Sequence, residues 1–238
     1  MKTNQDQKKS GPKVAEIKAS DPGALEAELG EKSPFPGRGE NPGPGFEDYA
    51  LASQVVYRLA LSAMAKPTKR FFYDFKSLIK SPPPLPYVVA ALALTLCDHL
   101  TPVWLSPSFE KAESFLVFHG SVPIVREPAK ADFVLCAGLG EMPNLAELNQ
   151  GDPRYPDRST TVILGRAFEE LDSGLDLWAF GPGLEDETVF QNHGLDRQFV
   201  AQWALNRAGY PLGLDVFLAG SDWLAALPRS LTLRLKAS

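Results

Sequence analysis

The chain has 238 residues, of which 44% are hydrophobic, and a formal net charge of −5 at pH 7. A protein of this length buries on the order of 70% of its unfolded surface, so it is long enough for one substantial domain. The acidic balance argues against a nucleic-acid or anionic-membrane partner, because either would need a basic face to neutralise phosphates.

Residues 1–45 are predicted to form a disordered or flexible N-terminal extension. Up to Phe46 the sequence holds seven Gly and six Pro but only two aromatic residues, and such a segment cannot bury enough apolar area to offset its ordering entropy. The start, MKTNQDQKK, has no apolar signal core, and no run reaches the ~20 apolar residues that span a bilayer. We therefore expect a cytoplasmic protein whose residues 46–238 form a single α/β domain.

From Phe46 the pattern predicts a helix that ends at Lys66-Pro67. Its apolar residues recur at four-residue spacing and form one stripe with the neighbours that widen it: Leu51, Val55, Leu59 and Ala63, with Val56, Ala60 and Met64. Residues 69–75 then mix cations with aromatics. This mixture has two interpretations, a platform for single-stranded nucleic acid, or an edge strand or loop whose aromatics cap the core. The negative net charge of the chain favours the second interpretation.

Residues 88–105 are predicted to be the centre of the fold. Between residues 86 and 96 only Thr95 interrupts an apolar run, so a helix here is hydrophobic on every side, as expected of a helix buried among other elements. Residues 101–105 follow as a short buried strand, since Pro102 is tolerated only near a strand start. A buried helix that leads into a buried strand predicts a layered α/β domain.

The second half of the chain is predicted to be rich in strands. A short helix comes first, with Ser108 as its N-cap and an end at His119-Gly120, and a longer helix is expected at 195–207 before Gly209. The expected buried faces of these helices are Phe109, Ala112, Phe115 and Leu116, and Phe199, Val200, Trp203 and Ala204. Strands are predicted at 124–125, 131–137, 159–164, 175–180, 188–190, 214–219 and 231–235, with a short helical turn near 223–227.

These elements amount to about seven strands and four or five helices. Helices cluster early and several strands follow one another later, so a mixed sheet is expected rather than a purely parallel one. The two cysteines, Cys97 and Cys136, each lie in an apolar run. We expect both to be small packing residues rather than partners in a disulfide.

The triplet Cys97-Asp98-His99 has the residue types of a nucleophile, an acid and a base. Adjacent residues on a helix point about 100° apart, so the three converge on one substrate atom only if the helix ends between them. Two interpretations stay open. One is a cryptic hydrolase centre. The other, which we favour, has Asp98 and His99 closing the helix, with His99 near the negative end of its dipole.

The other histidines, His119 and His193, stand alone in the sequence. No pair of histidines has metal-ligand spacing and no CxxC motif exists, so we expect no protein-held metal. Asp98, His99 and His119 are retained as candidates for lining a cleft.

Arg158 and Ser159 lie where a polar loop enters a predicted strand. Arg158 offers a forked permanent charge and Ser159 a hydroxyl, and backbone N–H groups at the strand entry could join them around a phosphate or phosphonate. The alternative, which we favour, is an Arg–Asp pair that holds a turn. Asp215 and Arg229 are either buried charge partners or residues of the same cleft. Arg229 therefore joins Arg158 and Ser159 as a ligand-binding candidate, and Asp215 is a cleft candidate.

No lysine occurs between Lys130 and Lys236. A cofactor held as a Schiff base needs a lysine amine. The strand-rich second half of the chain therefore contains no residue that could form such a site.

Eight segments carry a resemblance to a known family: YRLALSAMAKP at 57–67, ALTLCDHLTPVWL at 93–105, FHG at 118–120, ADFVL at 131–135, YPDRS at 155–159, GPG at 181–183, YPLGLD at 210–215 and ALPR at 226–229. In this order and spacing the chain, from about Phe46 to Leu235, resembles the PhnH family, a subunit of the bacterial carbon–phosphorus lyase system for phosphonate use. Thr68 departs from the family pattern, which usually has Gly there, and Ser230-Leu231 replaces a usual pair of threonines.

The resemblance implies a three-layer α/β/α sandwich with a mixed sheet, similar to the large domain of PLP-dependent transferases but lacking PLP and any other cofactor. It also implies a subunit of a core complex with the G, I, J and K proteins, and we expect a homodimer when the chain is isolated.

With the G, I and L proteins, such complexes displace adenine from MgATP by an alkylphosphonate and form α-D-ribose 1-methylphosphonate 5-triphosphate or its homologues. In that setting we expect a non-catalytic assembly subunit. The alternatives are a phosphate- or phosphonate-binding module, and a cryptic hydrolase that uses Asp98 and His99.

Overall fold

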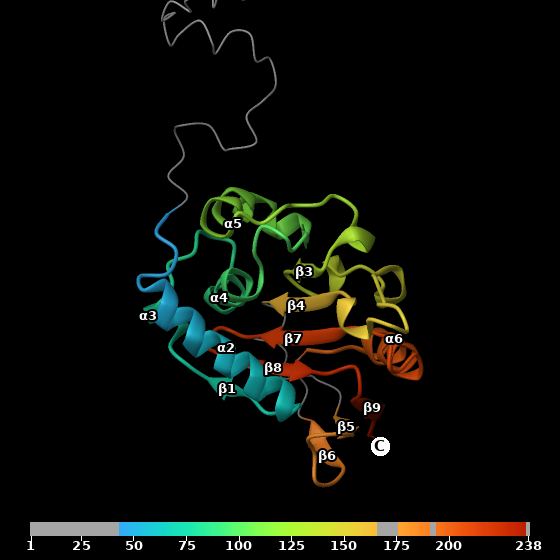
Figure 1. Ribbon diagram of the computed structural model, residues 1–238. Coiled ribbons are helices and arrows are strands. Elements are labelled where there is room, and N and C mark those ends of the chain that lie inside the picture. Colours follow the sequence, from blue (N-terminus) through green and yellow to red (C-terminus); the bar gives the residue numbers. More distant parts are fainter. Residues whose placement is uncertain (1–42, 166–175, 191–193, 237–238) are drawn as a thin grey trace, which may run out of the picture. The chain divides into compact units, whose positions relative to one another are not determined.

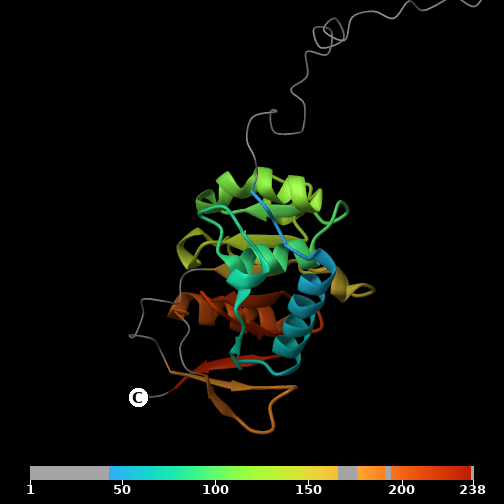
Figure 2. The same ribbon diagram turned by 90° about the vertical axis from the view of Figure 1, so that its left-hand side faces the viewer.

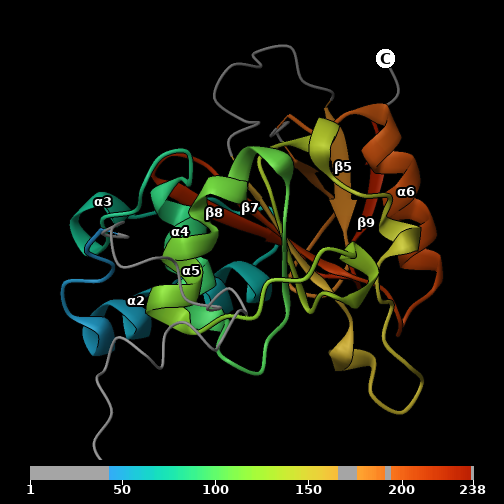
Figure 3. The same ribbon diagram turned by 90° about the horizontal axis from the view of Figure 1, so that it is seen from above.

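Helices pack against both faces of a six-stranded sheet (Figures 1 and 3). The structure, a computed structural model, describes residues 43–165, 176–190 and 194–236. The predicted extension at 1–45 lies outside these ranges apart from residues 43–45, which contact His119. The α/β class predicted from the sequence is confirmed.

Nine strands form two sheets in the described ranges, where the sequence predicted one sheet of about seven strands. The strands are β1 (Phe71–Phe72), β2 (Val103–Leu105), β3 (Phe133–Cys136), β4 (Thr161–Gly165), β5 (Leu177–Phe180), β6 (Thr188–Phe190), β7 (Asp215–Ala219), β8 (Trp223–Leu227) and β9 (Thr232–Leu235). The larger sheet has the order β1-β8-β7-β4-β3-β2, with β2, β3, β4 and β7 parallel and β8 and β1 antiparallel to their neighbours. It is therefore mixed, as predicted. The smaller sheet, β6-β5-β9, is antiparallel.

Side chains of the central strands alternate between two hydrophobic cores, one on each face of the larger sheet. In β7, Phe217 and Ala219 belong to the first core, whereas Val216 and Leu218 belong to the second. A strand that is buried on both faces needs apolar residues at every position. This requirement explains the uninterrupted runs FVLC in β3 and VFLA in β7.

The helices divide between these two cores. The first core takes α2 (Tyr49–Ala65), α3 (Phe75–Leu78), α4 (Tyr87–Leu96) and α5 (Glu113–Gly120), and the second takes α6 (Arg197–Ala208) together with the smaller sheet. Figure 3 shows β7 and β8 running between the two groups. The indole N–H of Trp203 in α6 donates to the carbonyl of Leu231 at 2.9 Å, which ties α6 to the residue before β9.

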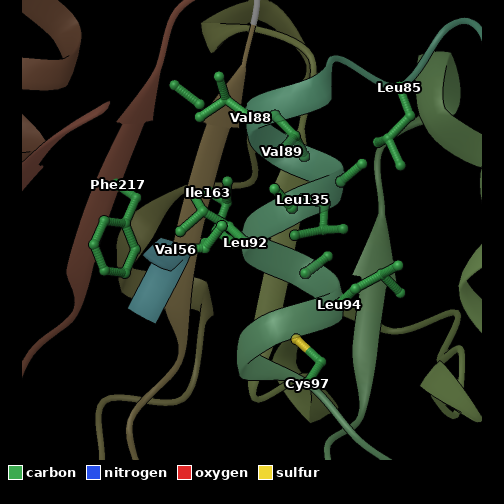
Figure 4. Close-up of a cluster of buried hydrophobic side chains, with 14 of the residues drawn as sticks. Val56, Leu85, Val88, Val89, Leu92, Leu94, Cys97, Leu135, Ile163 and Phe217 are labelled. Carbon is green, nitrogen blue, oxygen red and sulfur yellow. The ribbon is translucent and has the colours of Figure 1, made fainter. Parts of the chain in front are cut away.

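The helix α4 is buried on every side, as predicted. Residues 88–94 are each at most 1% exposed. Figure 4 shows the labelled side chains of this helix among those of α2, β3, β4 and β7. At the end of β4, a Cβ added to Gly165 would lie 2.7 Å from Cγ2 of Val89, so glycine allows the helix to cross the sheet closely. The Tyr49 hydroxyl donates to the carbonyl of Leu94 at 2.6 Å and satisfies a carbonyl of the last turn.

The predicted stripe of α2 is right in part. Of the buried residues, Val56, Ala60 and Ala63 belong to it, whereas Ala52 does not. Leu51, the first residue of the predicted stripe, is 58% exposed. The sequence has apolar residues around most of this helix, so periodicity alone could not choose the face, and close packing of α2 on α4 and β8 selects the side rich in alanine.

The predicted helical turn near 223–227 is wrong, because these residues form β8. All five are buried, and they pair antiparallel with β7, with Leu227 opposite Val216. Alanine and leucine favour a helix locally, but pairing with a central strand overrides that weak preference.

Two smaller predictions also fail. The helical segment before α5 begins two residues earlier than expected, as a 3-10 helix at Pro107–Ala112 with Ser106 at its N-cap, and Ser108 bonds to Glu141 instead. In α6, Ala204 is exposed and Asn206 is buried. The Asn206 amide accepts from the Leu214 N–H at 2.7 Å and donates to the Leu214 carbonyl at 3.0 Å, so it directs the chain into β7.

Candidate functional site

Four predicted site residues gather at the amino-terminal edge of the parallel strands. Asp215 is the first residue of β7, and Ser159 lies two residues before β4. Because β8 runs antiparallel to β7, Arg229 returns to the same edge just after β8 ends. The topology therefore brings Arg158, Ser159, Asp215 and Arg229 together, as the sequence suggested for the last two.

Arg229 and Asp215 are charge partners, the first of the two interpretations given above. The Arg229 Nε lies 3.2 Å from both carboxylate oxygens of Asp215, Nη2 donates to Oδ2, and the Arg229 backbone N–H donates to Oδ1 at 2.7 Å. Nη1 donates to the carbonyl of Pro156. The guanidinium thus joins the start of β7, the segment after β8 and the loop before β4.

Arg158 and Ser159 occupy different environments at this edge. The guanidinium carbon of Arg158 lies 4.1 Å from the centre of the exposed Tyr155 ring. Ser159 is 5% exposed, and its hydroxyl has no hydrogen-bond partner among the described residues. One group is therefore at the surface and the other is enclosed.

The turn in this loop is held by an aspartate, but not through an ion pair with Arg158. The Asp152 carboxylate accepts from the backbone N–H groups of Arg154 at 2.8 Å and Tyr155 at 3.1 Å, a common way to stabilise a turn. No salt bridge of Arg158 is found in the described ranges. The Arg–Asp pair that we favoured for this turn is therefore wrong, and Asp152 performs that role.

Cys97 is the C-cap of α4, and Asp98 and His99 lie directly after it. Burial raises the pKa of the Cys97 thiol, which keeps it neutral near pH 7. The exposed Asp98 carboxylate accepts from the Leu100 N–H at 2.9 Å and the Thr101 hydroxyl at 2.8 Å, and these bonds lower its pKa. In the described part of the chain no hydrogen bond joins any two of the three. Asp98 therefore holds the turn that follows α4, whose C-cap is Cys97.

His119 anchors the segment that enters the domain. Its ring packs on Phe115 and Phe118, with centroids 4.7 and 5.0 Å away, and Nε2 lies 2.8 Å from the carbonyl of Gly43. A Cβ on Gly45 would lie 2.8 Å from Nδ1, so glycine is needed for this approach. His119 therefore has a packing role here. His193 lies outside the described residues.

A cleft of about 750 Å³ lies between the connection from α2 to β1 and the hairpin of β5 and β6. We call it the hairpin cleft. Its two walls are residues 66–70 and residues 183–186 with Thr188 and Val189. Figures 1 and 2 show the two segments side by side. The sequence prediction missed this cleft, although three cations within 66–70 and the GPG turn before three consecutive acidic residues were visible signals.

A second cleft of about 570 Å³ lies beyond the carboxyl end of β7. Its walls are formed by residues 74–76, Ser81, residues 83–87 and the pair Ser221 and Asp222. The carboxyl ends of parallel strands are the usual ligand side of open α/β sheets. The cluster around Arg229 lies at the opposite end of the strands, which is unusual for a ligand site in this class of fold.

The described ranges contain neither a metal-binding cluster nor a membrane-spanning helix. No group of three His, Cys, Asp or Glu side chains there could hold a metal ion. None of the helices there has the length and apolar character needed to cross a membrane.

Comparison with known proteins gives one family. The sequence model described as "Bacterial phosphonate metabolism protein (PhnH)" matches residues 44–234. A protein of Rhizobium meliloti named alpha-D-ribose 1-methylphosphonate 5-triphosphate synthase subunit PhnH is 33% identical over 190 residues, which cover 79% of this chain and 93% of that protein. A putative C-P lyase subunit of Stutzerimonas stutzeri, HtxG, is 32% identical over 111 residues, which cover 45% of this chain and 53% of that protein.

Proposed function

Because the chain belongs to the PhnH family of bacterial phosphonate metabolism proteins, we propose that it is a subunit of α-D-ribose 1-methylphosphonate 5-triphosphate synthase in carbon–phosphorus lyase phosphonate breakdown. The family match over residues 44–234 supports this function. So does the Rhizobium relative of that name, because the match spans 93% of that protein.

In this role the chain supports the reaction of MgATP with an alkylphosphonate by assembling other subunits, and it does not supply reacting groups. One observation carries this proposal. Arg229 and Asp215 form the charged pair of the predicted site. All three nitrogens of the Arg229 guanidinium bond to segments of its own domain. A ligand-binding arginine instead directs its forked donors at the ligand.

The proposed partners are the G, I, J and K proteins of the same system, and the proposed state of the isolated chain is a homodimer in the cytoplasm. The family resemblance supports the partners. The names of both relatives support membership of a complex, because each is described as a subunit.

A finer description of the fold accompanies this function. We propose a three-layer α/β/α sandwich that is related to the large domain of PLP-dependent transferases but does not bind PLP. The parallel strands with helices on both faces support the relationship. The lack of lysine between Lys130 and Lys236 supports the loss of PLP, because the imine needs a lysine.

Co-purification tests the proposed function. The full chain, carrying an affinity tag, is co-expressed with the untagged G, I, J and K proteins from the same genome. We expect the partners to be retained with the tagged chain and to elute with it as one species in size-exclusion chromatography. Elution of the chain apart from all four partners would contradict the proposal. Light scattering of the chain alone tests the homodimer separately.

A further inference from the structure

Close contacts hold both walls of the hairpin cleft in place. Gly183 has a φ of +88°, and a Cβ there would lie 2.6 Å from the carbonyl oxygen of Ala65 and 2.7 Å from Cδ of Pro67. Only glycine therefore lets the β5–β6 hairpin approach the end of α2 so closely. The wall formed by residues 66–70 is attached to the larger sheet, because the Thr68 N–H donates to the carbonyl of Ala226 in β8 at 3.3 Å.

One wall of the cleft is cationic. Lys66, Lys69 and Arg70 line it within five consecutive residues. Neither lysine ammonium forms a salt bridge within the described ranges. The Arg70 guanidinium carbon lies 4.6 Å from the centre of the Trp223 ring, so stacking orients this side chain. Lys69 Nζ lies 5.6 Å from the Phe71 ring centre.

The opposite wall is acidic. Glu185 and Asp186 line the cleft from the β5–β6 hairpin. A simple anion would be attracted by one wall and repelled by the other. A polyphosphate that carries a bound magnesium ion suits both, because phosphate oxygens take Lys and Arg donors while Mg²⁺ accepts one or two carboxylates in addition to phosphate.

We propose that the hairpin cleft binds a magnesium-complexed polyphosphate chain, with Lys66, Lys69 and Arg70 on the phosphate oxygens and Glu185 and Asp186 facing the metal. The volume of about 750 Å³ lies within the range of small-molecule sites. The polyphosphate can be free or part of a nucleotide. That it is a triphosphate rests on the proposed function, because a 5-triphosphate is part of the product named for the Rhizobium relative.

Calorimetry on the full isolated chain tests the proposal. The titrants are tripolyphosphate and ATP, each with and without Mg²⁺, together with inorganic phosphate, methylphosphonate and a thymidine oligonucleotide. We expect Mg–tripolyphosphate and MgATP to bind with similar affinity, at least tenfold more tightly than phosphate or methylphosphonate. The proposal would be overturned if MgATP binds but Mg–tripolyphosphate does not. Tighter binding of the oligonucleotide, or no binding of any titrant, would overturn it too.

Matched variants locate the site. In Lys66→Gln/Lys69→Gln the affinity for Mg–tripolyphosphate should fall at least tenfold, whereas Lys111→Gln/Lys130→Gln makes the same charge change elsewhere and should alter it less than twofold. Glu185→Gln/Asp186→Asn should remove the dependence on Mg²⁺. Equal losses in both lysine pairs would contradict a site in the cleft. Circular dichroism confirms that each variant is folded, and failure of binding leaves the co-purification result unaffected.

Discussion

The Nε of Arg229 lies 3.2 Å from each carboxylate oxygen of Asp215, and the same guanidinium donates to the carbonyl of Pro156. The two side chains are 15% and 20% exposed. This contact joins the loop at Pro156 to the two ends of the β7–β8 hairpin, at the end of the sheet away from the usual ligand side. The pair therefore contributes to the stability of the domain.

We expect Arg229→Ala to lower the free energy of unfolding by about 2–3 kcal/mol, because it leaves the mostly buried Asp215 charge without its partner; the full cost of breaking a buried pair is reduced by the remaining exposure. Arg126→Ala removes an exposed pair with Glu113 and should cost less than about 0.5 kcal/mol. Urea unfolding of both variants measures the difference. Equal effects would show that the Arg229 pair is energetically unimportant.

The enclosed Ser159 hydroxyl gives a second prediction. It has no partner among the described residues, so Ser159→Ala should leave the free energy of unfolding unchanged or raise it by up to about 1 kcal/mol. The neighbour Thr160 is the control, because its hydroxyl donates to the carbonyl of Ala131 at 2.7 Å, and Thr160→Val should cost about 1 kcal/mol. If Ser159→Ala is the more harmful change, the serine has a function that these contacts do not explain.

The buried helix α4 predicts a large cost for a cavity. Leu92 is fully buried in the first core, so Leu92→Ala should lower the free energy of unfolding by about 3–4 kcal/mol. The same change at Leu61, which is 53% exposed on α2, should cost less than about 0.5 kcal/mol. Chemical denaturation compares the two. A small loss at Leu92 would mean that α4 does not lie at the centre of the fold.

Both cysteines should be chemically inert in the folded protein. Burial raises the pKa of the Cys97 and Cys136 thiols. A raised pKa means that the reactive thiolate is scarcer than in a free cysteine at any pH up to about 9. A colorimetric disulfide reagent at pH 8 should therefore label neither residue until denaturant is added. Rapid labelling of Cys97 without denaturant would revive the hydrolase interpretation.

Glu141 predicts a pH-dependent contribution to stability. Its carboxylate accepts from the Ser108 hydroxyl and from the Ser108 N–H at 3.1 Å, and these bonds lower its pKa below the ordinary 4.5. A lowered folded-state pKa gives stability that is present above the ordinary value and is lost as pH falls through the folded-state value.

Wild-type protein should therefore exceed Glu141→Gln in the free energy of unfolding by about 0.5 kcal/mol at pH 7, as expected for a carboxylate at a helical N-terminus. The difference should shrink toward pH 3. Urea titrations at several pH values measure it, and a difference that grows on acidification would contradict the assignment.

The predictable parts of the fold are the segments whose side chains are almost all apolar, because such segments must be buried. Residues 88–94 have no polar side to turn toward water, so a buried helix was the one arrangement open to them. The strands β3, β4 and β7 follow for a similar reason. The strand β8 was not predictable, because WLAAL is compatible with a helix until β7 provides a pairing partner.

The candidate site was predictable only in part, because its geometry comes from tertiary structure. Asp215 and Arg229 are charged residues beside apolar strands, which suggested a pair. By contrast, the hairpin cleft joins residues 66–70 with residues 183–189, and no local pattern predicts that these segments meet. Thr68 adds a conflict of its own. Its φ of +71° is a conformation that favours glycine, the residue that the resemblance leads one to expect at this position.

Adenine release from MgATP in the presence of methylphosphonate tests the central claim most directly. The reaction is followed with this chain alone, with the G, I and L proteins alone, and with all of them together. We predict no release by the isolated chain and full activity only in the complete mixture. Release of adenine by this chain without its partners, or undiminished release when it is omitted, would contradict the account.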